Sequence, residues 1–529
     1  MKKTILFAVT LLVSQSLVSC FSDDSTDAGV LADFEVSGIE EEYTKTSYIG
    51  EVLSISPTVV TDFADSDVAY EWMLLSDKTG SITEKGDTLQ PTVISHEKNL
   101  SYDMNLAPGT YQLRFLVRNV RNGYTKISYT KLISVTEFSA GFYILKETAD
   151  GRTDLDLYTS NGTTASDLLA KVKGEPMAGK PYSLWVNYGQ YYINPDDDQI
   201  ATSNSITVIT DQKQILTLRT SDLGTMFDRS SLLFGDMDAN EQPYALIFHP
   251  MYGLAYLSTS GLRLANHQYS MGGAGESAGK FGMPVEATQG SKHVAVSFAS
   301  FGNMNLWDEA THSIVALNYN YMPSPMTYDD FSGAELTQNL TGYECLSAGV
   351  SKVGSAETDN IILEETSTGQ RYIYLMSNSI RGQYLTKRVS VPAGSHFAKA
   401  VHFATNGQSA RYIYAAEGGK VWALNYDSDE YTEVEIPTPG IGSGETISYV
   451  ANQFIAGSGS ANFDYLIVGT QQAGGYKLYM YETVGGAPTT NPIIVTQGTG
   501  TLKCVRNVSP GASIANMAMF GTPVYPTND

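Results

Sequence analysis

Hydrophobic and polar residues alternate along much of the chain, with a period of two that predicts β-strands. Between residues 109 and 119, Leu113, Phe115 and Val117 fall on one face, and Gln112 and Arg114 fall on the other. This alternation is typical of a strand with one buried face. Helical periodicity is hard to find beyond residue 137, so the pattern predicts an all-β protein.

Residues 30–137 predict an antiparallel β-sandwich of about 100 residues. One strand places Tyr70 and Trp72 on the same face. A turn at Pro108-Gly109 starts a later strand, and the turn 121–123 (Arg-Asn-Gly) leads into another. We expect Trp72 to lie in the core of this sandwich, because a strand tryptophan is more often buried than presented to a ligand.

The pattern along residues 138–529 predicts an all-β architecture different from the sandwich, in which pairs of strands recur around short turns. FYILKETADGRTDLDLYTS, from Phe142, and YIYAAEGGKVWALNYDS, from Tyr412, are two such pairs. The pairs lie about 40–60 residues apart, the period of a propeller blade, so about seven blades fit. A last strand near Val505 or Met517 would join the first blade and close the ring. The competing interpretation is a string of further β-sandwiches, although no linker is evident after Phe138.

The N-terminal residues 1–19 have the pattern of a signal peptide. Lys2 and Lys3 precede a short apolar run, and Leu-Val-Ser-Cys follows, ending at Cys20. This ending resembles a bacterial lipobox, which implies that Cys20 is diacylated and becomes the mature N-terminus. An ordinary signal peptide is the alternative. Residues 20–29 form an acidic tether that resembles the export signal of Bacteroidota surface lipoproteins. That resemblance implies an outer-membrane protein facing the extracellular side.

The charge of the chain excludes some partners. The formal net charge is −23, and removal of Lys2 and Lys3 with the signal peptide gives −25. Such acidity argues against nucleic acid and anionic lipid as partners. No segment after the signal peptide has the run of apolar residues that a membrane helix needs, so the only membrane contact expected is the lipid anchor. With Cys20 lipidated, Cys345 and Cys504 remain. We expect them to be buried small apolar residues, and a disulfide between them is the alternative.

No candidate for catalysis or for a cofactor stands out. The sequence Gly275-Glu276-Ser277-Ala278-Gly279 matches G-x-S-x-G, but neither the strand nor the helix of a hydrolase elbow flanks it. Two sets of closely spaced aspartates could hold calcium in a propeller loop, and we favour solvated turns for both. The first set contains Asp150, Asp154 and Asp156, and the second is Asp236-Met237-Asp238-Ala239-Asn240. We expect no catalytic residue, no cofactor and no metal.

Aromatic residues give the clearest hint of binding. The stretch LWVNYGQYYINPDDD concentrates Trp185, Tyr188, Tyr191 and Tyr192 beside polar and acidic residues. Exposed tyrosine and tryptophan offer rigid amphipathic surface to sugars, peptides or protein partners. We therefore predict that these four residues contact a ligand or partner. The alternative is packing, because β-strands are rich in tyrosine.

The tryptophan strand and the Pro-Gly-Thr-Tyr-x-Leu-x-Phe-x-Val strand resemble a PKD-type immunoglobulin-like domain. Together with the lipobox, the acidic tether and the propeller pattern, the chain resembles the PKD-like family of Bacteroidota surface lipoproteins. This resemblance implies an accessory lipoprotein of a SusC/SusD-type TonB-dependent importer of peptides or oligosaccharides, with the sandwich as a spacer. Two other functions stay open: a glycan- or peptide-degrading enzyme on a propeller scaffold, and a purely structural bracing protein.

Overall fold

The computed structural model describes most of the chain from residue 33 to residue 508. The described ranges are 33–76, 79–80, 88, 90–195, 198–249, 253–265, 277–285, 291–296, 304–308, 311–317, 323–325, 340–353, 356–379, 382–407, 409–455 and 463–508. Their regular secondary structure is nearly all strand, and the helices within them are too short to cross a membrane. The predicted all-β class is therefore confirmed.

The chain divides into two compact units. The first comprises Met1–Thr44, Val52–Tyr102 and Thr110–Ile133, and the second comprises Lys45–Glu51, Asp103–Gly109 and Ser134–Asp529. Two short segments, Lys45–Glu51 and Asp103–Gly109, group with the second unit although the chain around them belongs to the first.

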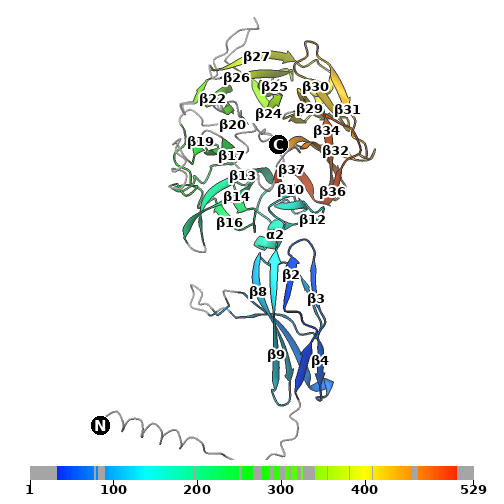
Figure 1. The fold of residues 1–529 in the computed structure, drawn as a ribbon. Helices are drawn as coiled ribbons and strands as arrows, with labels where there is room; N and C mark the ends of the chain where they lie inside the picture. Colours follow the sequence, from blue (N-terminus) through cyan, green and yellow to red (C-terminus); the bar gives the residue numbers. More distant parts are fainter. Residues whose placement is uncertain are drawn as a thin grey trace, which may run out of the picture. The chain divides into compact units, whose positions relative to one another are not determined.

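The first unit is a β-sandwich in which β1 and β4, β5 and β6, and β5 and β8 pair antiparallel (Figure 1). Its largest sheet has the order β2-β9-β8-β5-β6, and β1-β4 and β3-β7 form two-stranded sheets. Trp72 is fully buried, and its ring lies 4.5 Å from that of Phe115, as the sequence predicts. The elements are β1 (Phe34–Ser37), β2 (Glu42–Thr46), β3 (Val52–Ile55), β4 (Thr58–Thr61), η1 (Asp65–Asp67), β5 (Val68–Leu75), β6 (Thr92–Ser95), β7 (Leu100–Asp103), β8 (Gly109–Asn119) and β9 (Thr125–Val135).

The second unit is a β-propeller, and its described residues form seven sheets around a common axis (Figure 1). The first sheet combines β37 (Thr501–Val508) with β10 (Gly141–Glu147), β11 (Thr153–Thr159) and β12 (Thr164–Ala165). The second contains β13 (Pro181–Asn194), β14 (Gln199–Thr210), β15 (Ile215–Arg219) and β16 (Thr225–Asp228). The third contains β17 (Pro243–His249), β18 (Gly253–Ser258) and β19 (Gly261–Leu264). The fourth contains β20 (Ser291–Val296), β21 (Met304–Asp308), β22 (Ser313–Leu317) and β23 (Pro323–Pro325).

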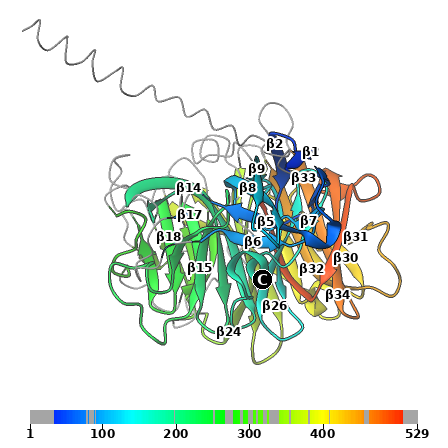
Figure 2. The ribbon, with the colours of Figure 1, turned by 90° about the horizontal axis from the view of Figure 1, so that it is seen from below.

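Three more sheets complete the ring, whose strands run between its two faces (Figure 2). The fifth contains β24 (Tyr343–Val353), β25 (Ala356–Glu365), β26 (Arg371–Ser379) and β27 (Gly382–Ser390). The sixth contains β28 (His402–Thr405), β29 (Tyr412–Glu417), β30 (Lys420–Asn425) and β31 (Glu433–Ile436). The seventh contains β32 (Thr446–Ile455), β33 (Phe463–Gln472), β34 (Gly475–Val484), β35 (Ala487–Pro488) and β36 (Ile494–Thr499). Two short helices, α2 (Leu168–Lys173) and α3 (His396–Lys399), connect strands.

The last described strand, β37, closes the ring, as predicted for a strand near Val505; the other position considered, Met517, lies outside the described residues. β37 pairs with β10 and places Val505 opposite Ile144. It therefore supplies the first strand of a sheet whose other strands come from the start of the propeller. Tight turns also follow the prediction, because Gly418 and Gly419 both have positive φ, at 62° and 74°, in the hairpin between β29 and β30. Cys345 and Cys504 are buried, as expected.

Buried amide side chains join neighbouring blades, in addition to apolar packing. Asn187 on β13 donates a hydrogen bond to the backbone carbonyl of Leu246 on β17, at 2.9 Å. Gln453 on β32 donates to the carbonyl of Val505 on β37, at 2.6 Å. A buried polar group costs stability unless it is paired, so these bonds fix how adjacent blades meet.

Candidate functional site

The predicted lipid attachment residue, Cys20, lies outside the described residues. The same holds for the signal peptide, 1–19, and the tether, 20–29. The lipid anchor and the outer-membrane location stay predictions from the sequence.

The predicted aromatic patch lies largely in the core of the propeller. Trp185 is 3% exposed, Tyr188 7% and Tyr192 5%, and only Tyr191 is half-buried. All four lie on β13, the first strand of its blade, which packs between β37 and β17. The indole N–H of Trp185 donates to the hydroxyl of Ser183 at 2.9 Å. This burial indicates a packing role for three of the four, and ligand binding here stays a prediction that depends on Tyr191.

Replacement of Trp185 by alanine is expected to lower the free energy of unfolding of the propeller by about 3–5 kcal/mol, the usual cost of truncating a core aromatic. Urea unfolding followed by circular dichroism would measure this cost. The control is Tyr191→Ala on the same strand, which removes a side chain that is only half-buried and should cost less. A Trp185→Ala protein as stable as the control would contradict the packing role.

The first aspartate set departs from the prediction of solvated turns at two of its three positions. Asp150 is exposed in a turn as expected, but Asp154 and Asp156 are buried on β11. Asp156 pairs with the Lys146 ammonium, with 2.7 Å between Oδ1 and Nζ. Asp154 accepts a hydrogen bond from the backbone N–H of Leu169, in the first turn of α2, at 2.8 Å. The prediction was wrong there because a lysine and backbone donors satisfy the carboxylates inside the blade.

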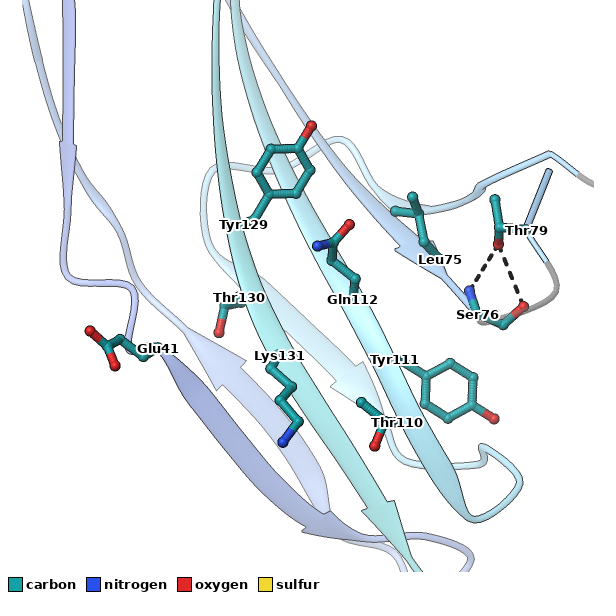
Figure 3. Close-up of a pocket in the computed structure, with 10 residues that line it drawn as sticks. All are labelled: Glu41, Leu75, Ser76, Thr79, Thr110, Tyr111, Gln112, Tyr129, Thr130 and Lys131. Atoms are coloured by element: carbon teal, nitrogen blue, oxygen red, sulfur yellow. Dashed lines mark hydrogen bonds between the residues drawn. The ribbon is translucent and has the colours of Figure 1, made fainter.

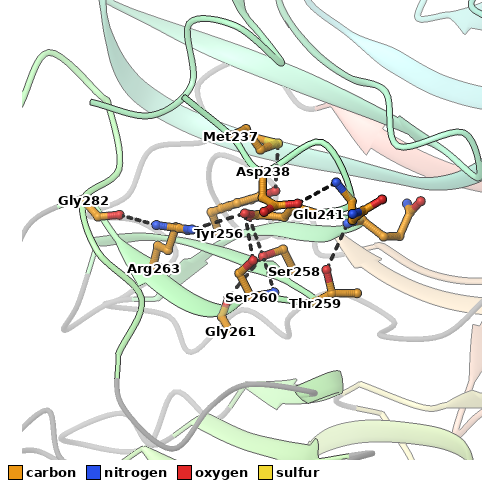
Figure 4. A network of polar contacts seen from close by, with 12 residues as sticks. Met237, Asp238, Glu241, Tyr256, Ser258, Thr259, Ser260, Gly261, Arg263 and Gly282 are labelled. Carbon is orange, nitrogen blue, oxygen red and sulfur yellow. Dashed lines mark hydrogen bonds and ion pairs between the residues drawn. The ribbon is translucent and has the colours of Figure 1, made fainter. Parts of the chain in front are cut away.

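The second aspartate set is exposed, as predicted: the side chains of Asp236, Asp238 and Asn240 all face solvent. A network of polar contacts lies beside it (Figure 4). The guanidinium of Arg229 donates to the backbone carbonyls of Asp238 and Glu241. The Glu241 carboxylate is buried and accepts from the Ser258 hydroxyl at 2.7 Å and from Arg263 at 3.2 Å. The Glu241 carboxylate, which follows the set in the sequence, is thus already bound by a hydroxyl and a guanidinium. No group of three or more metal-ligating side chains occurs in the part of the chain that the structure describes.

The G-x-S-x-G sequence forms a turn where it is described. Gly275 and Glu276 lie outside the described residues, and 277–279 are a turn in which the Gly279 N–H donates to the Ser277 hydroxyl at 3.2 Å. Gly279 has φ of 79°, and a Cβ there would lie 1.9 Å from the carbonyl oxygen of Tyr191. Close backbone approach therefore explains the second glycine of the motif.

The candidate ligand site is a hollow of about 630 Å³ on the first unit (Figure 3). It lies over β9, β8 and the end of β5, and the residue before β2 also lines it. Its ten lining residues are Glu41, Leu75, Ser76, Thr79, Thr110, Tyr111, Gln112, Tyr129, Thr130 and Lys131. The set combines hydroxyl, amide and aromatic groups with one carboxylate and one ammonium, which suits binding of a polar organic ligand.

The alternation of the strands fixes which side chains face outward at the hollow. On β9, Thr130 is buried and its neighbours Tyr129 and Lys131 are exposed. Gln112 on β8 is exposed and pairs with Leu75 on β5, so these two share a face. Tyr129 is 55% exposed, a large value for a tyrosine in the middle of a strand. An aromatic residue at a position of the strand where the alternation predicts a polar side chain is the sequence signal that could have located this site.

A model of the PKD-like family matches residues 20–181, which are 162 of the 529 residues. The match spans the sandwich and the first strands of the propeller, so the N-terminal part of the chain is PKD-like. No curated protein matches the chain in a sequence comparison.

Solved structures with a similar arrangement come from several organisms. A quinoprotein alcohol dehydrogenase-like protein from Bacteroides thetaiotaomicron is 14% identical, with a TM-score of 0.45, over 88% of this chain and 96% of that one. AztD from Citrobacter koseri is 10% identical, with a TM-score of 0.32, over 83% and 100% of the two chains. An inactive virginiamycin B lyase from Staphylococcus aureus is 9% identical, with a TM-score of 0.27, over 79% and 96%. Identities and TM-scores this low do not indicate the function of this chain.

Proposed function

We propose that this chain is a non-enzymatic surface lipoprotein that binds a ligand as the accessory subunit of a SusC/SusD-type importer. The observation that carries the binding role is the open hollow on the PKD-like sandwich, which combines an exposed tyrosine with hydroxyl and amide groups. The lipobox at Cys20 and the acidic tether support an outer-membrane anchor that faces outward. The proposed cargo is a peptide or an oligosaccharide, and no metal or other cofactor is required.

The test is a mild-detergent pull-down of the tagged full-length protein from native outer membrane, with mass spectrometry of the eluate. We expect a SusC/SusD-type pair in near-equal amount. A Cys20→Ala variant is the control, because it removes the proposed lipid attachment. Recovery of the lipoprotein alone, from membranes in which such a pair is abundant, would overturn the accessory role.

A further inference from the structure

We propose that the hollow on the sandwich binds a segment of a neutral oligosaccharide, with the exposed ring of Tyr129 as its stacking platform. The inference rests on the proposed binding function and names its site and its ligand class. It also gives the sandwich a role that the sequence does not predict, since the family resemblance implies only a spacer.

The first argument is the exposed ring. Tyr129 is held on β9, an eleven-residue strand in the interior of its sheet, and it is 55% exposed. Ile127, two residues earlier on the same face, is also exposed, at 39%. A rigidly placed aromatic ring offers contact area at a low cost in conformational entropy. One flat ring beside polar groups matches a sugar ring, which has apolar C–H faces and a polar rim.

The second argument is the polar lining. The Gln112 side-chain amide supplies both donors and an acceptor, and the hydroxyls of Ser76, Thr79 and Thr110 can do either. The Thr79 hydroxyl already accepts from the backbone N–H of Ser76 at 2.9 Å, which orders this wall of the hollow (Figure 3). Many weak donors and acceptors around one apolar platform suit a ligand rich in hydroxyl groups.

The third argument is charge. The Lys131 ammonium lies 2.7 Å from the Glu42 carboxylate, and Glu41 lines the same hollow. The only ammonium among the described lining residues is therefore balanced by acidic neighbours. Phosphate, sulfate or an acidic sugar would meet net negative charge here, so the hollow favours a neutral ligand.

The fourth argument separates an oligosaccharide from a peptide. Extended peptides gain affinity by adding a strand to an open sheet edge. The hollow lies over β9, β8 and β5, the three middle strands of the order β2-β9-β8-β5-β6, and not along the outer edge of either edge strand. The site offers side chains on a sheet face, which can contact sugar rings but cannot extend the sheet.

Calorimetric titration of the mature protein tests the inference. The probes are neutral hexasaccharides built from glucose, mannose, xylose or galactose, with α- and β-linkages, at millimolar concentration. We expect at least one to bind, with affinity about tenfold weaker in Tyr129→Ala and several-fold weaker in Gln112→Ala. Tyr129→Phe keeps the ring and should keep most of the affinity. Unchanged melting temperatures of the variants would exclude unfolding as the cause.

The other outcomes separate this inference from the proposed function. If no glycan binds while the pull-down recovers a SusC/SusD-type pair, the hollow is not a glycan site and the accessory role survives. If a glycan binds with dependence on Tyr129 but no pair is recovered, the site stands and the accessory role fails. Loss of glycan binding in Tyr191→Ala, but not in Tyr129→Ala, would place the ligand on the propeller and overturn the inference.

Discussion

Replacement of Lys146 by methionine is expected to lower the free energy of unfolding of the propeller by about 3–5 kcal/mol. Lys146 and Asp156 are both fully buried, and their charged atoms lie 2.7 Å apart. The Tyr476 hydroxyl, from the seventh blade, donates to the other oxygen of Asp156 at 2.6 Å. Methionine fills the space of the lysine stem but leaves the Asp156 carboxylate buried without its countercharge. Urea unfolding at pH 7, followed by circular dichroism, would measure the loss.

The charge state of the lysine supports this expectation. Burial alone would lower the pKa of Lys146, but Asp156 and Asp167 outweigh burial and raise the pKa above its ordinary value of 10.5. The ammonium is therefore charged at neutral pH in the folded protein. Its removal takes away a full positive charge from the interior of the first blade.

A matched control comes from a neighbouring ion pair, between Glu147 at the end of β10 and Lys180 just before β13. The Lys180 ammonium lies 2.9 Å from Glu147, at a position where the lysine side chain is 62% exposed. Lys180→Met should cost far less, because water solvates the remaining carboxylate. The double variant Lys146→Met with Asp156→Asn should recover part of the lost stability. If Lys146→Met and Lys180→Met lower the free energy of unfolding equally, the buried ion pair contributes no more to stability than the exposed pair.

The sequence predicts the fold class from local pattern. The alternation of Leu113, Phe115 and Val117 marks a half-buried strand, and β8 buries these three residues and leaves the two between them only half-buried. Ring closure near Val505 also follows from strand spacing alone. Each of these features depends on residues close in the chain or on a count of repeating units.

The function of individual side chains depends on contacts that local pattern does not contain. Alternation shows that Trp185 lies on one face of a strand, but not that the next blade covers that face. Asp156 and Tyr476 are 320 residues apart, so nothing near Asp156 indicates its partner across the first and seventh blades. Side chains from separate strands of one sheet line the hollow. Only Tyr129, an aromatic residue at a polar position of its strand, indicates the site in the sequence.

Removal of residues 501–529 is expected to abolish cooperative unfolding of the propeller. β37 is the strand that joins the last blade to the first, and it buries Leu502, Cys504, Val505 and Val508. Burial of four such side chains contributes about 6–12 kcal/mol, which is comparable to the whole stability of a typical domain. Without β37, the apolar strand β10 would also become an open edge that favours aggregation. Thermal unfolding followed by circular dichroism would show a broad transition at lower temperature.

Two further chains distinguish loss of the strand from loss of the residues after it. A chain that ends at Val508 keeps all of β37 and serves as the matched control for the deletion. A synthetic peptide with the sequence of residues 501–508 should bind the deleted chain and restore a cooperative transition, because it can pair with β10 from Glu147 to Gly141. If the deleted chain melts as sharply and at the same temperature as the chain ending at Val508, the pairing of β10 with β37 does not contribute to the stability of the propeller. The ring would then be held by its blade-to-blade contacts alone, and closure by the C-terminal strand would be dispensable for the propeller.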